Sequence, residues 1–264
     1  MRLVTWNINS VRLRIGLVKR LTEEAAPDVL CLQETKTQDE FFPVEALKEM
    51  GYVHQHFSGM KSYNGQAIVS KLPFEETHIY DRVGRSDCRH IAVRINGKVL
   101  HNIYIPAGGD EPDAVINDKF AHKLDFVDEM AGWFKDTYTP DQPQIVVGDF
   151  NIAPHEHDVW SHKQLLKVVS HTLPETERLA KMQASLDWTD VAREFISEEE
   201  KAYTWWSYRN RDWKKSNRGR RLDHVWVTPP LKDSLKFYEA LHHARDWEKP
   251  SDHVPVIVDF QSFS

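Results

Sequence analysis

Several apolar segments of the sequence end at a polar residue that can bind a metal ion or a phosphate group. Asn7, Glu34, Tyr104 and Asp149 each follow such a segment, and Asn151 comes two positions after the last of them. Strands that are buried in a sheet bring their ends to a common rim, so residues far apart in the sequence can meet there. We therefore expect these five side chains to form part of one site.

The remainder of this site is expected from the C-terminal part of the chain. Asp252 and His253 precede the last apolar segment, and Asp223 lies at an earlier one, where it is the candidate partner that orients the His253 imidazole. Most of these side chains are oxygen ligands, which suit a hard cation such as Mg²⁺ or Mn²⁺ and not zinc. A zinc site built on His155 and His157 is a weaker alternative, because no matching carboxylates accompany these histidines.

Each motif has an ordinary structural interpretation when it is taken alone. In Gly148-Asp149-Phe150-Asn151, the aspartate can orient or deprotonate water and the asparagine can donate hydrogen bonds to a phosphoryl oxygen. The same four residues are also typical of a turn with an Asx cap. Glu34 could equally be a charge where a strand reaches the surface, and Tyr104 a half-buried residue before a Pro-Gly turn. The interpretation therefore depends on how many such motifs occur together.

The charge distribution is uneven. The net charge of −6 argues against a nucleic-acid partner, because such binding depends on neutralising phosphates. Residues 209 to 221, however, contain seven basic residues and the single acid Asp212. Four aromatic residues lie before or within this basic run and could stack on bases or sugars: Trp205, Trp206, Tyr208 and Trp213. Local potential governs docking more than total charge does, so the run keeps a nucleic-acid partner open.

The composition favours one globular unit over residues 1–264. The 264 residues are 41% hydrophobic, and no linker divides them. No apolar run approaches the roughly 20 residues that span a bilayer, and Met1 leads directly into an expected strand. The two cysteines, Cys31 and Cys88, have no disulfide or metal spacing. We expect a cytoplasmic protein without a membrane segment.

Strands and helices are expected to mix without strict alternation, which predicts an α+β protein with packed sheets and outer helices. Besides the apolar segments described above, strands are expected at 65–70, 222–227 and 254–260, and a hairpin at 90–104 turns at Asn96-Gly97. Helices are expected at 10–25 with Ser10 as the cap, 40–50, 117–136, 157–169 and 174–186.

Taken together, the motifs resemble the exonuclease III family of abasic-site endonucleases over nearly the whole chain. Seven of them occur in the order and approximate spacing of that family: Trp6-Asn7-Ile8-Asn9, Leu32-Gln33-Glu34-Thr35-Lys36, Tyr104-Ile105-Pro106, Gly148-Asp149-Phe150-Asn151-Ile152, the segment 203–209, Arg221-Leu222-Asp223-His224 and Ser251-Asp252-His253. The resemblance implies the four-layer α/β sandwich of DNase I and metal-dependent hydrolysis of DNA phosphodiesters, namely incision 5′ to abasic sites with 3′-to-5′ exonuclease and 3′-phosphodiesterase activity on duplex DNA.

The resemblance also implies roles for the site residues. Glu34 would hold Mg²⁺, or Mn²⁺ in its place, with help from Asn7 and Asp252, while Asp149, Asn151 and His253 are the other candidate ligands of one or two ions. Asp149 would position or deprotonate the attacking water, and Asn151 would bond the scissile phosphate. Tyr104 would act near the leaving group, and His253 with Asp223 would stabilise the charge that develops on the phosphate. The sequence leaves open whether Asp149 or His253 is the base.

Damage recognition is expected to depend on an apolar pocket that contains Trp205 and Leu222, with Arg209 and Arg220 as further DNA contacts. A sugar without a base can leave the helix at low unstacking cost and enter such a pocket. Three positions depart from relatives: Ala107 stands where many have Asn or Gln, Arg220 where some have Trp, and Asn9 where some have Asp. The balance among the activities therefore stays open.

Two other functions fit parts of the pattern. Phosphatases of inositol phosphates and sphingomyelinases share the fold and several site residues, which makes a phosphoesterase acting on inositol phosphates or phospholipids the main alternative. A non-catalytic nucleic-acid binder is less favoured, because all the catalytic groups are present. We expect a monomer that acts on duplex DNA with abasic sites or blocked 3′ ends.

Overall fold

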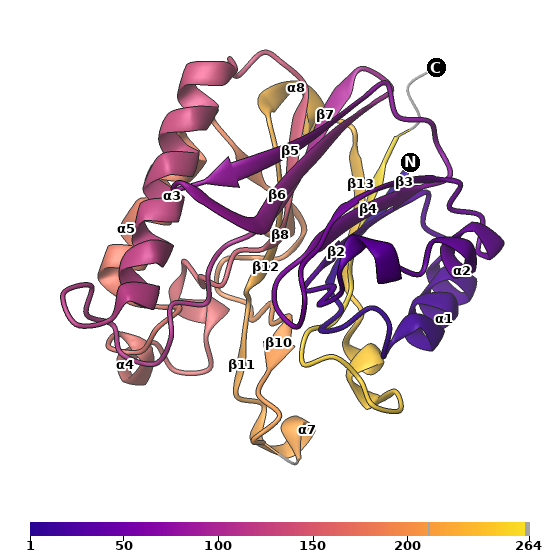
Figure 1. The fold of residues 1–264 in the computed structure, drawn as a ribbon. Coiled ribbons are helices and arrows are strands. Elements are labelled where there is room, and N and C mark those ends of the chain that lie inside the picture. The colour runs from indigo at the N-terminus through magenta and orange to yellow at the C-terminus, as the bar shows by residue number, and fades with distance from the viewer. Residues whose placement is uncertain (211, 262–264) are drawn as a thin grey trace.

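Two six-stranded sheets pack face to face, and helices cover their outer faces, which gives four layers (Figure 1). The structure is a computed structural model that describes residues 1–210 and 212–261. The predicted α+β class is confirmed. Both sheets are mixed, because parallel and antiparallel pairs occur in each.

The first sheet has the order β13-β14-β1-β2-β4-β3. Its strands are β1 (Arg2–Asn7), β2 (Val29–Gln33), β3 (His54–Ser58), β4 (Gln66–Ser70), β13 (Leu235–Ala240) and β14 (Val256–Phe260). The second sheet has the order β5-β6-β7-β8-β12-β9. Its strands are β5 (Glu76–Arg82), β6 (Arg85–Ile95), β7 (Lys98–Tyr104), β8 (Gln144–Asp149), β9 (Thr189–Asp190) and β12 (Asp223–Val227).

Helices lie outside both sheets, and short elements line the lower rim in Figure 1. The main helices are α1 (Ile15–Ala25) and α2 (Val44–Glu49) beside the first sheet, and α3 (Asp118–Thr137) and α5 (Leu173–Ala184) beside the second. The short helices are α4 (His162–Leu165), α6 (Val191–Phe195), α7 (Trp213–Ser216) and α8 (Pro229–Lys232), with 3₁₀ turns at Asp39–Phe41, Glu156–Asp158 and His242–Asp246. A small two-stranded sheet joins β10 (Trp205–Trp206) to β11 (Gly219–Arg220).

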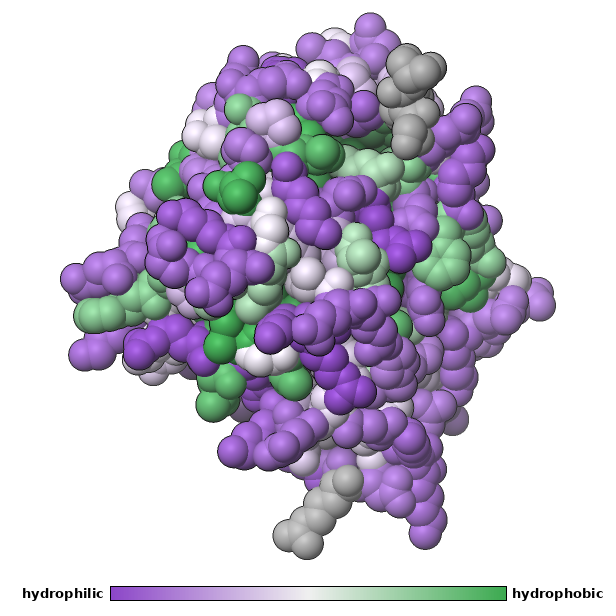
Figure 2. All heavy atoms as spheres, turned by 90° about the vertical axis from the view of Figure 1, so that its right-hand side faces the viewer, coloured by the Kyte–Doolittle hydropathy of each residue, from purple (hydrophilic) through white to green (hydrophobic). Residues whose placement is uncertain are grey.

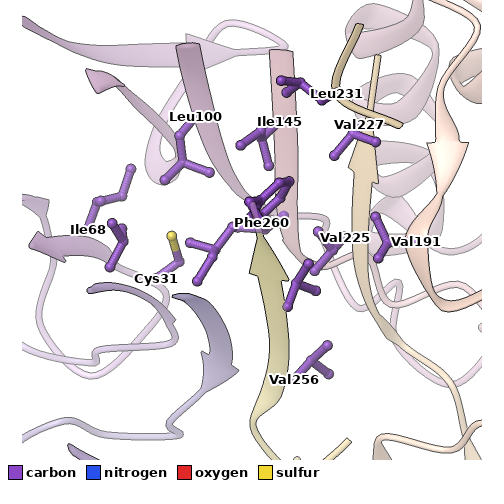
Figure 3. Packing of buried hydrophobic residues seen from close by; sticks show 14 of the residues in the cluster. Cys31, Ile68, Leu100, Ile145, Val191, Val225, Val227, Leu231, Val256 and Phe260 are labelled. Atoms are coloured by element: carbon purple, nitrogen blue, oxygen red, sulfur yellow. The ribbon is translucent and has the colours of Figure 1, made fainter. Parts of the chain in front are cut away.

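The central core lies between the two sheets. Cys31 and Ile68 from the first sheet face Leu100, Ile145 and other apolar residues of the second (Figure 3). Separate apolar clusters fill the space under α1 and α2 and under α3 and α5. Burial of these side chains is the main favourable contribution to folding, at about 25 cal/mol per Å² of apolar surface. The strands are therefore rigidly placed up to the ends that carry the candidate site.

Polar side chains also join the two sheets within this core, close to the rim. The Asn102 amide nitrogen donates to the carbonyl oxygens of Leu32 and Ala67, and the Gln33 amide nitrogen donates to Asn102 Oδ1 at 2.7 Å and to Thr5 Oγ1 at 2.9 Å. Buried hydrogen bonds of this kind are directional, whereas apolar packing is not. They fix the relative position of β2 and β7, the strands that lead to Glu34 and Tyr104.

Several predicted elements are confirmed. The hairpin turns at Asn96-Gly97, where both residues have positive φ angles, and Asn117 caps α3 by accepting a hydrogen bond from the Lys119 amide. The predicted helix at 174–186 is α5, and the predicted strands at 65–70, 222–227 and 254–260 are β4, β12 and β14.

Three helix predictions are wrong in extent. The first helix begins at Ile15, because Ser10 takes a left-handed conformation and its amide bonds the carbonyl oxygen of Glu34. The predicted helix at 40–50 is a 3₁₀ turn followed by α2, since Pro43 separates them. The predicted helix at 157–169 contains only a 3₁₀ turn and α4, and its last residues Val168 and Val169 line a pocket. Strands β3, β5 and β13 are not among the predicted elements.

The outer face over α1 and α2 is largely hydrophilic, with hydrophobic residues in small groups (Figure 2). Within residues 1–210 and 212–261, none of the helices combines the length and the apolar character that crossing a bilayer requires.

A chain of buried side chains under α3 predicts sensitivity to acid. Arg82 donates to His90 Nδ1, His90 pairs with His101 at 3.0 Å, and His101 bonds Gln144 Oε1 at 3.1 Å. Both imidazoles are fully buried, and burial lowers the pKa of His101 to about 3 and that of His90 well below its usual value. The unfolded chain binds protons at these histidines below about pH 6.5 and the folded chain does not, so acid favours unfolding.

We therefore expect the wild type to lose about 2 kcal/mol more unfolding free energy than His101→Gln when the pH falls from 7 to 5. Urea unfolding at the two pH values measures this difference. His54→Gln, on the half-exposed part of β3, is the matched control and should follow the wild type. Equal losses in the wild type and His101→Gln would contradict a neutral His101 in the folded protein.

Candidate active site

The predicted convergence of strand ends occurs at one rim. Asn7 ends β1 beside β2, which leads to Glu34, and Tyr104 at the end of β7 pairs with Asp149 at the end of β8. Asp223, the first residue of β12, pairs with Asp149 from the other side. The rim therefore receives residues from both sheets, and Asp149 lies at its centre.

Asn7 links the two sheets at this rim. Its amide nitrogen donates to Glu34 Oε1 and to Asp149 Oδ2, both at 2.9 Å. The Tyr104 hydroxyl donates to the same Glu34 oxygen at 2.9 Å. Asn7 Oδ1 accepts the backbone amide of Asn9, so the Asn7 side chain orients both carboxylates.

Several rim residues, among them Glu34 and Asn151, have left-handed backbone conformations. Glu34 has a φ angle of 50° and Asn151 one of 52°. Such a conformation is unfavourable for a residue other than glycine, asparagine or aspartate, and strained residues of this kind tend to cluster at functional sites. The Asn151 amide bonds Asp149 Oδ1, and its side chain donates to Asp149 Oδ2 and to the carbonyl oxygen of Ile105. Asn151 is thus held directly against Asp149, as its spacing of two residues predicts.

His253 and Asp223 form the predicted pair. His253 Nδ1 lies 2.8 Å from Asp223 Oδ2, and its Nε2 faces Asp149 Oδ2 at 3.6 Å. Thr204 donates to Asp223 Oδ2 at 2.6 Å and accepts the backbone amides of Leu222 and Asp223, so this carboxylate has a fixed orientation. Asp149, Asp223 and His253 bring ligand atoms within 4.8 Å of one another, a group that excludes His155 and His157 among the described residues.

The electrostatics differ among the acids. Burial raises the pKa of Asp149 to about 7, with Asp223 and Glu34 adding to the effect and His253 opposing it. Burial also disfavours the charged His253, but Asp223 and Asp149 outweigh it and raise the pKa of this imidazole to about 10. The pKa values of Glu34 and Asp252 are lowered despite burial, by Lys36 and Asn7 for the first and by His253 and Trp205 for the second. At neutral pH, Glu34 and Asp252 are therefore charged and His253 is protonated, whereas Asp149 can gain or lose a proton.

A cationic group contacts Glu34, one of the two acids that the resemblance assigns to the metal. Lys36 Nζ lies 2.7 Å from Glu34 Oε2 and donates to Asn9 Oδ1 at 2.7 Å, while Asn9 Nδ2 donates to Asp252 Oδ1 at 3.1 Å. Oxygen atoms of charged carboxylates and amides are the ligands that Mg²⁺ and Mn²⁺ prefer. The residues present thus fit a hard cation beside Glu34 and Asp252. The role of Lys36 was not predicted, although this residue lies within a motif that carries the resemblance.

A pocket of about 520 Å³ opens beside these acids. Trp205 and Leu222 form its apolar part, and the Trp205 ring nitrogen donates to Asp252 Oδ2 at 2.9 Å. Arg209 and Arg220 line it too, as do Tyr104, Asn151 and His253. The predicted pocket residues are therefore next to the predicted catalytic residues. Ala107 contributes to the wall without a side-chain hydrogen bond, and its carbonyl oxygen accepts from Lys123.

Only part of the basic run at 209–221 is available to a ligand. This corrects the prediction that the whole run and its neighbouring aromatic residues could contact a nucleic acid. Arg221 is fully buried and pairs with Asp158 and Asp190, each through two hydrogen bonds. Trp206 is buried in a core with Tyr203 and is not a free stacking surface. Arg211, which belongs to the predicted run, lies outside the described residues. The sequence pattern does not distinguish Arg221 from its neighbours, because its acidic partners lie more than thirty positions away.

Comparisons with known proteins agree with this geometry. The model of the Endonuclease/Exonuclease/phosphatase family matches residues 4–253. The chain belongs to this family. Among curated proteins, it is 26% identical to exodeoxyribonuclease III of Haemophilus influenzae over 99% of this chain and all of that protein, and 26% identical to an exodeoxyribonuclease of Bacillus subtilis over 97% and 98%.

Solved structures of nucleases and phosphatases that act on DNA have the same fold as this chain. An AP endonuclease from Archaeoglobus fulgidus aligns with a TM-score of 0.92 and 31% identity, covering 99% of this chain and 100% of that one. A variant of the 3′ phosphatase NExo from Neisseria, bound to a product DNA hairpin, aligns with a TM-score of 0.91 and 30% identity at the same coverage. The predicted exonuclease III-type fold and the enzyme class are confirmed.

The raised pKa of His253 can be measured directly. We expect the His253 imidazole to stay protonated from pH 6 to pH 9 in the wild type, because Asp223 and Asp149 stabilise its positive charge. Asp223→Asn keeps the shape of the side chain and removes its negative charge, so the His253 imidazole should release its proton at a lower pH. NMR titration of the histidine ring signals, with the His253 signal assigned by its loss in His253→Gln, measures this pKa in the wild type and in Asp223→Asn. A neutral His253 at pH 7 in the wild type would contradict this electrostatic description.

Proposed function

We propose that this protein is a Mg²⁺-dependent nuclease that hydrolyses the phosphodiester 5′ to an abasic site in duplex DNA and removes blocking groups from 3′ ends. The observation that carries the proposal is the position of the apolar Trp205–Leu222 pocket directly beside Asp149, His253 and Glu34. The acids provide phosphodiester chemistry, and the pocket provides selection for a sugar without a base. The relatives named for exodeoxyribonuclease, AP endonuclease and 3′ phosphatase activities support the same choice.

Metal binding is proposed at Glu34 and Asp252, with Asn7 and Asn9 as neighbouring amides. When bound, Mg²⁺, or Mn²⁺ in its place, would supply positive charge to the phosphate oxygens. Lys36 and the metal ion would both carry positive charge and would compete for Glu34 Oε2, which Lys36 contacts in this structure. Asp149, which Asn7 links to Glu34, and Asn151, which contacts Asp149, are proposed to complete the oxygen-rich set.

Asp149 is proposed as the general base. Its pKa of about 7 lets it exchange a proton near neutral pH, whereas His253 is already protonated there. Asn7 and Asn151 hold the two Asp149 oxygens, which orients the carboxylate toward the attacking water. His253, oriented by Asp223, faces the same region and would stabilise the negative charge that develops on the phosphoryl oxygens. Tyr104 would act on the side of the leaving oxygen.

The unit of function is proposed to be one chain of residues 1–264 acting as a monomer in the cytoplasm. One chain supplies both the acids and the pocket, so no second copy is required to complete the site. Arg209 and the exposed Arg218 are proposed to contact the DNA backbone, because phosphate contacts of this kind position a protein on duplex DNA.

The proposal is tested with a labelled duplex that carries one stable abasic analogue, compared with an intact duplex, in Mg²⁺ and in EDTA. We expect incision 5′ to the analogue by the wild type in Mg²⁺ only. Asp149→Asn should lower the rate by at least about 100-fold, because it removes the base. Absence of cleavage by folded, metal-supplied wild type would reject the proposal and favour inositol phosphates or phospholipids as substrates.

Two substitutions of Trp205 test whether the pocket binds the sugar. Trp205→Ala removes the aromatic wall and the bond to Asp252, whereas Trp205→Phe removes only the bond and keeps an apolar wall. We expect kcat/KM on the abasic duplex to fall about 100-fold in Trp205→Ala and less than about 10-fold in Trp205→Phe, since burial of the sugar against the ring is the larger effect. Mn²⁺ affinity, measured by calorimetry, should be similar in the two variants. Equal kinetic losses in both variants would assign the effect to the Asp252 bond.

A further inference from the structure

A buried ion pair lies next to the candidate active site. Lys123 of α3 and Glu175 of α5 have no exposed side-chain surface, and Lys123 Nζ lies 2.5 Å from Glu175 Oε1. Burial lowers the pKa of Lys123, and the negative charge of Glu175 opposes this shift. A buried charge is costly unless it is paired and hydrogen-bonded, so both side chains need further partners. These partners are backbone groups of the segments that form the site.

Lys123 bonds the segments that follow two neighbouring strands. Its Nζ donates to the carbonyl oxygen of Asn151 at 2.8 Å and to that of Ala107 at 3.2 Å. Asn151 follows the end of β8 and Ala107 follows the end of β7, and these strands pair in parallel. With the bond to Glu175, each of the three ammonium hydrogens has an acceptor. One side chain therefore joins two segments of the active-site rim.

Glu175 bonds a third segment, which precedes α5. Both of its oxygens accept the Ser170 amide at 2.9 Å, and Oε2 also accepts the amide of Thr172 at 3.0 Å and its hydroxyl at 2.7 Å. The bonds to Thr172 form the capping box at which α5 begins. The two members of the pair thus have separate tasks: Glu175 holds the start of α5, and Lys123 holds the rim.

Close packing keeps the Lys123 side chain in this position. The chain passes over it at Gly108, which has a φ angle of 90°. A Cβ atom at this glycine would lie 2.9 Å from Lys123 Cδ and 3.1 Å from Val169 Cγ1. Only glycine fits such a close approach with a positive φ angle. The ammonium group therefore has no other place to occupy, and its bonds to the two carbonyl oxygens are fixed.

The bond to Asn151 matters because this residue contacts Asp149. The Asn151 side chain donates to Asp149 Oδ2 at 3.1 Å and to the carbonyl oxygen of Ile105 at 2.9 Å. Asparagine tolerates the left-handed conformation found here but does not require it, so neighbouring groups must select it. Asp149 Oδ1 holds the amide of Asn151, and Lys123 holds its carbonyl oxygen. Without Lys123, the peptide group after Asn151 is free to turn and to carry the side chain with it.

We propose that Lys123 is a positioning residue for phosphodiester hydrolysis, which acts through the carbonyl oxygen of Asn151 to keep the Asn151 side chain against Asp149. The inference rests on the proposed function, in which Asn151 helps to orient the Asp149 carboxylate toward the attacking water. Lys123 is fully buried and does not touch the substrate. Its loss therefore affects the chemical step and leaves the surface that binds DNA in place.

The test measures kcat and KM for incision of the abasic duplex, at temperatures well below the melting temperature of each variant. Lys123→Met keeps an unbranched side chain and loses the bonds to Asn151, Ala107 and Glu175. We expect kcat to fall about 100-fold, the loss that follows when a catalytic group is displaced by roughly 1 Å. KM should change less than about 3-fold, because the contacts with DNA remain.

A double variant separates positioning from stability. Lys123→Met leaves the Glu175 charge buried without its cation, so the melting temperature should also fall. Lys123→Met/Glu175→Gln removes both charges and keeps an amide oxygen for the bonds to the segment before α5. The melting temperature should then recover, whereas kcat should stay about 100-fold below the wild-type value. Recovery of kcat in the folded double variant would overturn the inference. If Lys123→Met does not fold, the double variant still provides the comparison with the wild type.

Arg82→Met is the matched control. Arg82 is a buried cation that also pairs with a residue of α3, Glu129, but it does not line the pocket or contact the rim residues. This variant should have a lower melting temperature and a kcat within about 3-fold of the wild type. A loss of kcat as large as that of Lys123→Met would show that reduced stability alone slows the reaction, and it would overturn the positioning role.

The same assay distinguishes this inference from the proposed function. A wild type that incises the abasic duplex, together with a Lys123→Met variant whose kcat is unchanged, would overturn only the role of Lys123. A folded, metal-supplied wild type that does not incise the duplex would overturn the proposed function, and the inference with it.

Discussion

The arrangement of the site depends on one electrostatic constraint: the two sheets bring several carboxylates to the same buried rim. Asp149 and Asp223 are almost fully buried, and Glu34 and Asp252 lie beside them. Charged groups in a poorly solvated place repel each other unless positive charge is close. Burial raises the pKa of Asp149, and the neighbouring carboxylates of Asp223 and Glu34 raise it further. His253 and Lys36 compensate part of the negative charge, and a divalent cation beside Glu34 would compensate more.

Rigid contacts keep these charges from separating. The Asn102 and Gln33 bonds fix one sheet against the other just inside the rim, and Asn7 joins Glu34 to Asp149 across the same interface. The pocket is attached to the acids by the bond from Trp205 to Asp252. Trp205 therefore has two roles in this account: it forms the aromatic wall of the pocket, and it orients Asp252, a candidate metal ligand. This double role means that a change in the pocket alters the position of the acids as well.

The sequence predicts the rim and the pocket residues Trp205, Leu222, Arg209 and Arg220, but it does not predict which residues of the basic run are buried or how segment 157–169 folds. Asn7, Glu34, Tyr104 and Asp149 follow strands whose apolar runs are local signals, so their convergence follows from sheet geometry alone. The pairing of Asp223 with His253 is also predicted, because both residues lie at the ends of apolar segments that are expected to reach the same rim. Arg221 and Arg220 are adjacent in the sequence, yet Arg221 is neutralised by the distant acids Asp158 and Asp190, whereas Arg220 forms an ion pair with none of the described acids. The segment 157–169 has a helical pattern, but tertiary contacts such as the bridge between Val159 and Arg220 override its propensity.

The most direct test of the central claim is Mn²⁺ binding followed by isothermal titration calorimetry at pH 7. If the crowded carboxylates form a cation site, the wild type binds Mn²⁺, and both Glu34→Gln and Asp252→Asn weaken the affinity by at least about 10-fold, since each removes one charged ligand. Glu49→Gln, an exposed residue of α2, should leave the affinity unchanged. Binding that is absent in the wild type, or equally strong after the loss of Glu34 and Asp252, would contradict the account.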